Sequence, residues 1–330
     1  MKKKTAGDKT KSINILFTSV GNKISLIKSF KKAFHDLKMP GKTIGVDSDA
    51  FSAGLYIADK GYVVPSFESS HFFEKLVKIC LKEKVSAVVP TRDEDLLFFS
   101  KYKNKFDGVG IKILVSSFEP VSICADKWKF YLYLKKVGLP AIETWKEINS
   151  KIGFPCIVKP RSGKGGVGAL IVNSKKELSG LNLKEQIIQE KIEGVEYTVD
   201  YFADFNAQPI CIIPRIRFKI AGGESKVGIT KNEKNIVSLT KKLAQSLNLI
   251  GHNTIQCFKL KDGSIKFLEV NPRFGGGASL GVAAGCKSPE YIVSLLAGYK
   301  VKPVQKFIED LVMIRYSNDI FLPYDKINNL

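Results

Sequence analysis

Three side-chain oxygens come together if residues 253–273 form a β-hairpin. Asp262-Gly263 separates two strand-like apolar segments there, which favours a two-residue type I′ turn. That turn places Gln256 opposite Glu269, with Asn271 on the same strand face as Glu269. Opposed side chains have Cβ atoms about 4.5–5.5 Å apart. Because Mg²⁺ prefers hard oxygen ligands and completes its shell with phosphate and water, the hairpin predicts a magnesium site at these three residues.

The same register has two further consequences. It places Thr254 opposite Asn271, and it puts an aromatic pair, Phe258 and Phe267, beside the turn. The alternative to a metal site is an ordinary polar strand end.

A glycine-rich segment could close on phosphate groups. Strand-like runs at Cys156–Val158 and Ala169–Val172 flank Lys159-Pro160-Arg161-Ser162-Gly163-Lys164-Gly165-Gly166-Val167-Gly168. Glycines let backbone N–H groups approach phosphate oxygens closely. The segment is not a Walker A loop, because no Gly-Lys-Ser/Thr ends it and no helix is expected to follow. A surface hairpin without a ligand is the alternative.

A third segment, Gln189 to Asp200, indicates a strand, a short polar hinge and a new strand. Backbone amides in such a hinge can pair with a base edge, and a carboxylate there can bind a ribose. Composition alone does not distinguish this hinge from any other connection.

The elements that position these residues begin with an alternation of strands and helices over residues 13–120. We expect strands at Ile13–Ser19, Lys42–Asp47, Val85–Pro90 and Ile111–Val115, and helices at Lys23–Leu37, Phe72–Leu81 and Glu94–Tyr102. This β-α-β order predicts a parallel sheet covered on both faces. The first turn, Ser19-Val20-Gly21-Asn22, lacks the three glycines of a dinucleotide fingerprint.

The string Pro90-Thr91-Arg92-Asp93-Glu94-Asp95 follows one of these strands. Ligands of open α/β sheets bind at the carboxyl ends of strands, so Arg92 and Asp93 are candidate substrate residues. The alternative is that the three acids cap the next helix and complement its dipole.

Composition narrows the function classes. The 330 residues are 44% hydrophobic and 25% charged, which is typical of a globular protein and excludes disorder. The longest apolar runs are too short to cross a membrane, and the basic N-terminus leads into no signal sequence, so we expect a cytoplasmic protein. The six cysteines are scattered and favour buried thiols over a zinc site. The three histidines lie in unrelated settings, which disfavours a Ser-His-Asp triad.

The net charge of +20 invites a nucleic-acid partner. Only six of the 52 basic residues are Arg, and the lysines spread along the whole chain, often beside acids. The lysine excess is therefore interpreted as a solvated surface, and we expect no nucleic-acid partner.

In this order, the motifs resemble the ATP-grasp superfamily. The resemblance is greatest to the carbamoyl-phosphate synthase large-chain-like branch, which includes small amide-forming ligases such as that of pyrrolysine biosynthesis. It covers about Ile13 to Pro323, and Glu269-Val270-Asn271-Pro272-Arg273 is its most specific part. It implies an α/β fold with an α+β lid. The expected parts are a basic tail (1–12), a Rossmann-like pre-ATP-grasp domain (13–120), a linker helix (121–140) begun by Asp126, a lid (141–195) and a C-terminal subdomain (196–330).

The resemblance also assigns roles to residues. It implies that ATP phosphates bind Lys127, Lys159 and the lid loop Gly163, Lys164, Gly165, Gly166 and Gly168. It implies an adenine hinge at Glu190, Lys191 and Ile192, and a ribose contact at Glu196. Gln256, Glu269 and Asn271 match the metal positions, with two Mg²⁺ ions expected and Mn²⁺ as an alternative. Arg273, Arg215 and Arg217 are the predicted catalytic arginines, and Glu224 and Ser225 belong to a loop closing the acceptor side.

The implied activity is an ATP- and Mg²⁺-dependent carboxylate–amine ligase. An acyl phosphate would form and then react with an amine to give an amide, with small, amino-acid-like substrates as partners and a homodimer as one assembly. One alternative is phosphorylation of bicarbonate or carbamate. Others are a basic nucleic-acid-binding protein and a nucleotide-binding regulator without catalysis, although the intact metal set disfavours the last. The chain carries one such module rather than two, and no glutaminase is recognised in it.

Overall fold

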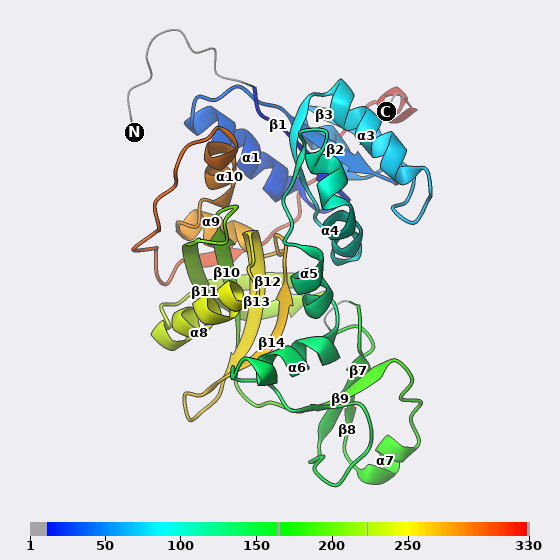
Figure 1. The fold of residues 1–330 in the computed structure, drawn as a ribbon, viewed down its shortest axis with the longest axis vertical. Coiled ribbons are helices and arrows are strands. Elements are labelled where there is room, and N and C mark those ends of the chain that lie inside the picture. The colour runs from blue at the N-terminus through cyan, green and yellow to red at the C-terminus, as the bar shows by residue number, and fades with distance from the viewer. Residues whose placement is uncertain (1–11, 164–165, 223, 329–330) are drawn as a thin grey trace.

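Three β-sheets organise the chain. The computed structural model describes residues 12–163, 166–222 and 224–328, and the described residues form fifteen strands and eleven helices (Figure 1). The predicted α/β fold with a parallel N-terminal sheet is confirmed. No helix in the described ranges combines the length and the apolar character needed to cross a membrane.

The first sheet is parallel. Its strands, in order across the sheet, are β3 (Lys60–Val63), β2 (Thr43–Asp47), β1 (Asn14–Thr18), β4 (Val85–Val89) and β5 (Lys112–Ile113). Its helices are α1 (Ile24–Asp36), α2 (Ala53–Ile57), α3 (Phe72–Lys82) and α4 (Asp93–Asp107). Phe17 packs against α1 and Leu16 against α3 and α4, so successive residues of β1 serve opposite faces. The chain reverses direction across the sheet between β1 and β4, where open sheets bind ligands.

The predicted strands and helices of this region are confirmed within a few residues, except that α4 is longer and β5 shorter than expected. β3 and α2 escaped prediction. β3 is an edge strand with no fully buried side chain, and α2 has only five residues, too few to show helical periodicity.

The second sheet is antiparallel and mixes distant parts of the chain. Its order is β14 (Ile265–Asn271), β13 (Gly251–Lys259), β10 (Val195–Ala203), β11 (Pro209–Ala221), β12 (Glu224–Thr230) and β15 (Val312–Ile314). Two helices, α6 (Lys127–Lys136) and α8 (Lys234–Ser246), pack apolar side chains onto it, among them Phe130 and Leu243. Asp126 caps α6 by accepting hydrogen bonds from the backbone N–H groups of Trp128 and Lys129 (3.0 and 3.1 Å), as predicted.

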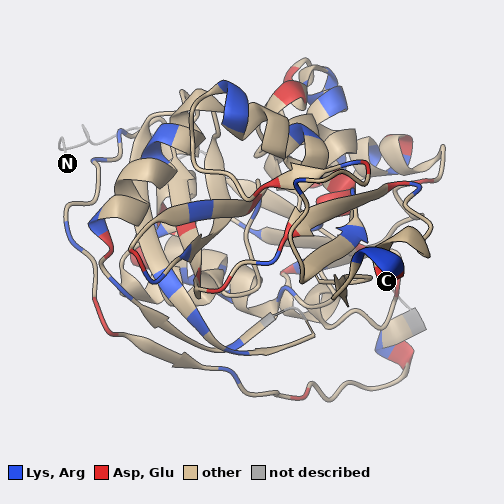
Figure 2. Cartoon of the chain, turned by 90° about the horizontal axis from the view of Figure 1, so that it is seen from below, with Lys and Arg blue, Asp and Glu red and all other residues tan. Residues whose placement is uncertain are grey.

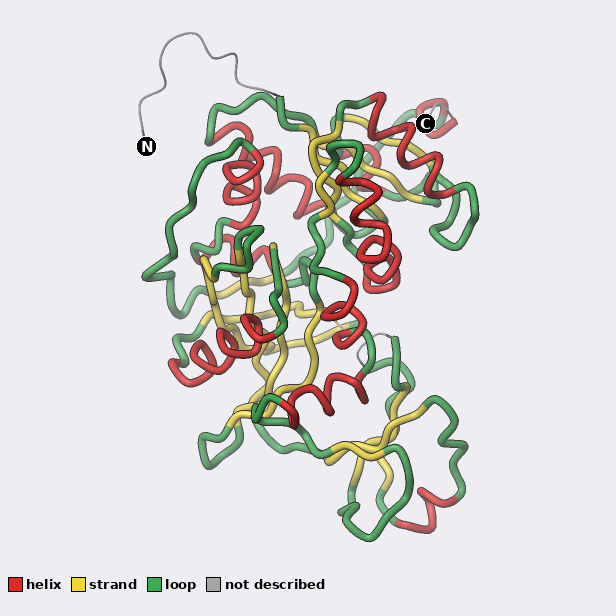
Figure 3. Tube along the Cα trace, in the orientation of Figure 1, coloured by secondary structure: helices red, strands yellow, loops and turns green. Residues whose placement is uncertain are grey.

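The third sheet is small and lies at one end of the molecule, away from the parallel sheet (Figure 3). It is antiparallel, with the order β6 (Thr144–Trp145), β9 (Gln186–Glu190), β7 (Cys156–Pro160) and β8 (Leu170–Val172), and it carries α7 (Lys175–Ser179). The remaining helices are α5 (Phe118–Cys124), α9 (Ala278–Ala284), α10 (Ser288–Leu296) and α11 (Asp325–Asn328).

An aromatic contact joins the parallel sheet to the second sheet. The Phe30 ring of α1 lies edge-on to Phe17, with centroids 4.9 Å apart, and to Phe274, at 6.1 Å. Phe274 follows β14, and the same apolar cluster includes Ala278 of α9 and Ile292 of α10. The end of β14 is thereby held against the N-terminal domain.

The hairpin of β13 and β14 has the predicted pairs at the candidate site. Thr254 pairs with Asn271, and Gln256 pairs with Glu269. A bulge at Leu268 interrupts the ladder just before these pairs.

Near the turn, the predicted register is wrong. The Leu260 N–H donates to the Ser264 carbonyl (2.9 Å), which leaves a three-residue loop instead of the two-residue turn. Phe258 therefore pairs with Lys266, and the predicted Phe258–Phe267 pair does not form. The bulge adds one residue to β14 and compensates for the longer loop, so the two deviations cancel at the site.

A buried ion cluster lies inside the second sheet. Asp200 of β10 accepts two hydrogen bonds from Arg215 of β11, at 2.8 and 3.3 Å, and both side chains are almost fully buried. His252 of β13 lies 3.4 Å from the same carboxylate. Burial opposes a charge on His252, but Asp200, helped by Cys286, raises its pKa to about 9. The Asp200 carboxylate thus favours the protonated form of His252.

Two glycines let the chain pass close to this cluster. A Cβ atom on Gly281 would lie 2.2 Å from Asp200 Oδ2, and one on Gly277 would lie 2.5 Å from Arg215 Nη1. Asp200 and Arg215 have no room to move away from such a Cβ atom, because both side chains are buried within the sheet.

We expect Gly281→Ala to lower the free energy of unfolding by about 1–3 kcal/mol, the usual cost of overpacking a core. Urea denaturation followed by circular dichroism measures this. The control is Gly108→Ala, whose Cβ atom would meet its nearest neighbours at an ordinary 3.5 Å. Equal midpoints for the two variants would contradict the steric argument.

Candidate active site

The three predicted metal ligands lie together on β13 and β14. Asn271 Nδ2 donates to Glu269 Oε1 (3.0 Å) and lies 3.4 Å from Gln256 Oε1. Gln256 Nε2 donates to Glu196 Oε1 of the neighbouring β10 (2.7 Å). Strand pairing thus brings four polar side chains from three strands into one network.

The donor set suits a cation that is shared with phosphate. Within the described ranges, no group of three or more His, Cys, Asp or Glu side chains could hold a metal alone. One carboxylate with two amide oxygens matches the coordination preference of Mg²⁺, which binds one or two carboxylates plus substrate phosphates. The residues present therefore fit Mg²⁺ when a phosphate-bearing ligand is also bound.

Two lysines approach this network from other elements. Lys127 is the first residue of α6, and its Nζ donates to the Gly163 carbonyl (3.2 Å). Lys159 lies on β7, and its Nζ donates to Gln189 Oε1 (2.7 Å). Neither lysine has a carboxylate within salt-bridge distance among the described residues, which leaves their charges available to an anionic ligand.

The pKa values of both lysines reflect this environment. Burial lowers the pKa of Lys159 to about 8, with Glu269 opposing and Lys127 adding to the shift. Burial also lowers the pKa of Lys127, against the charges of Glu269, Asp126 and Asp93. The same acid acts on both lysines, so Lys127, Lys159 and Glu269 share one electrostatic environment.

The glycine-rich loop connects β7 to β8. Gly163, Gly166 and Gly168 have φ values of +104°, +85° and +74°, a region that favours glycine. Arg161, at the start of the loop, forms an ion pair with Asp126 at the N-terminus of α6 (2.6 Å). Lys164 and Gly165, also predicted to bind phosphate, lie outside the described residues.

The predicted hinge connects β9 to β10, as the sequence indicated. Glu190 accepts a hydrogen bond from Lys266 of β14 (2.6 Å), which ties the third sheet to the second. Lys191 and Ile192 are half-buried in the connection itself.

Arg217 connects the candidate acceptor loop to the metal strands. Its Nη1 forms an ion pair with Glu196 Oε1 (2.7 Å), and its Nε donates to the buried Ser225 hydroxyl (3.3 Å). Glu196, the predicted ribose ligand, is therefore held between Arg217 and Gln256. Glu224 is the first residue of β12, and Gly223 before it lies outside the described residues.

Two predicted residues 180 positions apart meet directly. Arg273 donates from Nε to Asp93 Oδ1 (2.6 Å) and from Nη2 to Asp93 Oδ2. The acids at the start of α4 do not cap it, since the helix has no side-chain cap hydrogen bond. Asp93 instead binds Arg273, and Asp95 accepts hydrogen bonds from Thr18 and Ser19. Arg92 lies 3.4 Å from Glu94.

Arg215 is the one predicted catalytic arginine that stands apart. Its guanidinium group is 2% exposed and is bound by Asp200 in the buried cluster. These contacts give it a structural partner, so we propose a structural role in place of a substrate contact.

Sequence reasoning missed several partners. Gln189 links Lys159 to the Thr144 hydroxyl (3.0 Å from Gln189 Nε2), and Asp200 and His252 hold Arg215. Of these, only Asp200 stands between two apolar neighbours, Val199 and Tyr201, and that pattern is the signal that could have found it.

The arginines also bear on the net charge. Arg92, Arg161, Arg215, Arg217 and Arg273 each pair with a carboxylate. Basic and acidic residues are interspersed over the chain in Figure 2. Each of these arginines therefore already has an acidic partner, and the expected lack of a nucleic-acid partner stays a prediction.

Comparison with known proteins identifies the class. Residues 124–277 match the family model of the ATP-grasp domain, and residues 15–114 match that of the PylC-like N-terminal domain. The chain therefore contains an ATP-grasp domain, as the motifs predicted, and a PylC-like N-terminal domain.

A curated relative and two solved structures are similar to this chain. The chain is 30% identical over 220 residues to the carbamoyl phosphate synthase large chain of Caldanaerobacter subterraneus subsp. tengcongensis, covering 58% of this chain and 20% of that protein. It thus spans about a fifth of that relative's length.

The solved structures share the fold at low identity. The biotin carboxylase domain of Hydrogenobacter thermophilus 2-oxoglutarate carboxylase, a dimer in complex with MgADP, ADP and bicarbonate, has a TM-score of 0.72 and 17% identity over 89% of this chain and 72% of that chain. The L-amino acid ligase from Bacillus licheniformis has a TM-score of 0.68 and 17% identity over 88% of this chain and 75% of that chain.

We expect ATP binding near pH 8 to take up protons. Because its pKa is lowered to about 8, the Lys159 amino group is only partly protonated at this pH in the ATP-free protein. The negative charge of bound triphosphate would raise this pKa, so the lysine would take up a proton. Without ATP, the cost of burying this charge is relieved as pH rises from about 8 towards 10.5, so the free energy of unfolding increases in that window, where the unfolded chain still binds the proton.

Calorimetric titrations with ATP at pH 8, in buffers of different ionisation enthalpy, measure the uptake. Lys159→Met removes the titrating group with little change in side-chain length, and it should abolish most of the uptake. Equal uptake by this variant and the unsubstituted protein would show that another group is responsible.

Proposed function

We propose that this protein is an ATP- and Mg²⁺-dependent ligase that joins a small carboxylic acid to an amine. The single observation that carries the proposal is the meeting of Lys127, Lys159 and Glu269 beside the Arg273–Asp93 pair. Two half-buried lysines, neither with a carboxylate within salt-bridge distance among the described residues, favour a polyanion, and an oxygen-rich strand next to them favours the cation that accompanies it.

The proposed reaction has two steps. A carboxylate oxygen of the acid attacks the γ-phosphorus, the bond to the bridging oxygen breaks, and ADP leaves with the electron pair. The amine nitrogen then attacks the acyl carbon of the acyl phosphate, the C–O bond to phosphate breaks, and inorganic phosphate leaves. The amine loses a proton, and an amide results.

This chain's residues would bind and orient the reactants. Lys127 and Lys159 would hold the phosphates. Arg273, whose guanidinium group also binds Asp93, would neutralise negative charge at the phosphoryl group in transfer. Gln256, Glu269 and Asn271 would hold Mg²⁺, which offsets phosphate charge during transfer. The loop over Gly163–Gly168 would exclude water, which otherwise hydrolyses an acyl phosphate.

The division into domains is part of the proposal. Residues 13–120 would form the pre-ATP-grasp domain, 121–140 the linker, 141–195 the lid and 196–330 the C-terminal subdomain. Two bound ions, a homodimer and a cytoplasmic location stay predictions. The Hydrogenobacter thermophilus domain is a dimer in complex with MgADP, which is consistent with a homodimer and with bound Mg²⁺.

Phosphorylation of bicarbonate or carbamate is the second candidate. The similarity of 58% of this chain to a carbamoyl phosphate synthase large chain favours it. It uses the same ATP site and differs only in the acid that is phosphorylated.

A phosphate-release screen separates the two candidates. We expect ADP formation with pairs of carboxylic acids and amines, including amino acids singly and in pairs, and an amide product in mass spectrometry. ADP formed with bicarbonate alone would support the second candidate and contradict the first.

We expect Glu269→Gln to lower kcat/KM about 100-fold or more, because it removes the one carboxylate of the proposed metal set, and metal stabilisation of phosphoryl transfer amounts to several kcal/mol. The matched control is Glu74→Gln on the exposed surface of α3. Full ATP turnover in Glu269→Gln, with a circular dichroism spectrum unchanged from that of the unsubstituted protein, would contradict the metal assignment.

A further inference from the structure

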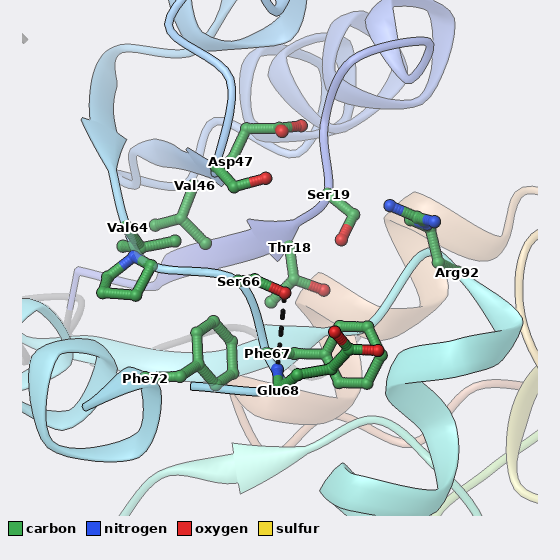
Figure 4. Close-up of a pocket in the computed structure, with 12 residues that line it drawn as sticks. Thr18, Ser19, Val46, Asp47, Val64, Ser66, Phe67, Glu68, Phe72 and Arg92 are labelled. Carbon is green, nitrogen blue, oxygen red and sulfur yellow. Dashed lines mark hydrogen bonds between the residues drawn. The ribbon is translucent and has the colours of Figure 1, made fainter. Parts of the chain in front are cut away.

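A polar pocket lies at the carboxyl ends of the parallel strands. Its volume is about 220 Å³, which is below the range of roughly 300–1,000 Å³ that holds drug-sized ligands. Ser19 follows β1, Asp47 ends β2, Glu68 lies in the connection after β3, and Arg92 precedes α4 (Figure 4). The pocket is therefore built by four successive strand ends at the switch point of the sheet, where a small molecule is expected.

The charges that line this pocket are mixed. Arg92 is its one lining cation, Asp47 and Glu68 are its carboxylates, and none of the described lining residues is a lysine, although the chain has a net charge of +20. A phosphate ester would face two acids there. A ligand carrying one carboxylate and one ammonium group would match both signs.

Hydrogen-bond directions favour the same ligand. Thr18 and Ser19 both donate their hydroxyl protons to the buried carboxylate of Asp95, at 3.1 and 2.8 Å. Their hydroxyl oxygens can then only accept from a ligand, as an ammonium group requires. Val46, Val64 and Phe72 supply an apolar wall, and Figure 4 draws Val64 and Phe72 on the side away from Arg92.

The place of Arg92 in the fold orients such a ligand. The next residue, Asp93, binds Arg273, which follows Asn271 of the metal strand by two positions. The Arg92 end of the pocket is therefore the end connected to the proposed phosphoryl-transfer site. An ammonium group held by Asp47 and Glu68 stays protonated, and it has no lone pair with which to react.

We propose that this pocket binds an α-amino acid with a small apolar side chain as the acid substrate, its carboxylate at Arg92 and its ammonium group at Asp47 and Glu68. This inference rests on the proposed ligase function and adds to it the pocket that holds the acid substrate, the orientation of that substrate and the end that reacts.

Hydroxylamine serves as a surrogate amine in the test. The full chain is incubated with ATP, Mg²⁺, hydroxylamine and one of the twenty common amino acids at a time, and hydroxamate and ADP are measured. We expect hydroxamates from small apolar amino acids such as alanine and valine, and poor reaction with propanoate, which lacks the amino group of alanine.

Variants then locate the binding site. Arg92→Ala should raise KM for the amino acid at least tenfold and leave KM for ATP unchanged. Glu68→Gln should reduce the preference for alanine over propanoate. Lys101→Ala, on the exposed surface of the same helix, should change neither constant.

Three results would overturn the inference while the ligase function stands. The first is an unchanged KM for the amino acid in Arg92→Ala. The second is hydroxamate formation that persists in Arg92→Ala while coupling to a carbon amine is lost, which would make this the amine pocket. The third is that the unsubstituted protein forms amides only from acids that lack an α-amino group. Absence of ADP formation with every acid and amine would instead remove the ligase function itself.

Discussion

The pairing of β10 with β13 and of β13 with β14 is the constraint on which the candidate site depends. It sets Glu196, Gln256 and Glu269 on adjacent strands, and a shift of one residue would turn each set of side chains to the opposite face. The bulge at Leu268 and the three-residue loop are each irregular, yet together they preserve the pairs at the site. The buried Asp200–Arg215 pair spans β10 and β11 of the same sheet. Breaking such a pair leaves an uncompensated buried charge, so a slip between these strands is costly.

Arginine pairing gives the rest of the site its arrangement. Arg273 binds Asp93 and so connects β14 to α4, while Arg217 binds Glu196 and connects β11 to β10. Arg161 binds Asp126 and connects the glycine-rich loop to α6. The planar fork of arginine suits these contacts between elements, since it fixes both distance and direction. Lys127 and Lys159 differ from these arginines, because within the described ranges neither forms an ion pair with a carboxylate. That is the arrangement expected of ligands for a mobile anion.

The sequence predicted the elements whose pattern is local. The parallel sheet, the cap at Asp126 and the Gln256–Glu269 pair follow from apolar runs, a capping residue and a turn signal. It did not predict β3, which is short and half-exposed, nor the bulge at Leu268, for which no residue type gives a signal. Contacts such as Arg273 with Asp93 depend on packing across 180 residues, and the partner of Arg215 could be found only by noticing that Asp200 lies between the apolar residues Val199 and Tyr201. Residue types therefore indicated the candidate site, while tertiary packing determined which carboxylate each arginine pairs with.

The third sheet differs from the other two in how it is attached, and this bears on how the site could close. Its core is small, with Cys156, Val158 and Ile188 at its centre. Its contacts with the second sheet and α6 include the ion pairs Lys266–Glu190, Arg161–Asp126 and Lys135–Glu143. Partly exposed ion pairs contribute little stability. The polar part of this attachment is therefore weak, and a triphosphate bound between Lys159 and Glu269 would add to the attraction that Glu269 already exerts on both lysines.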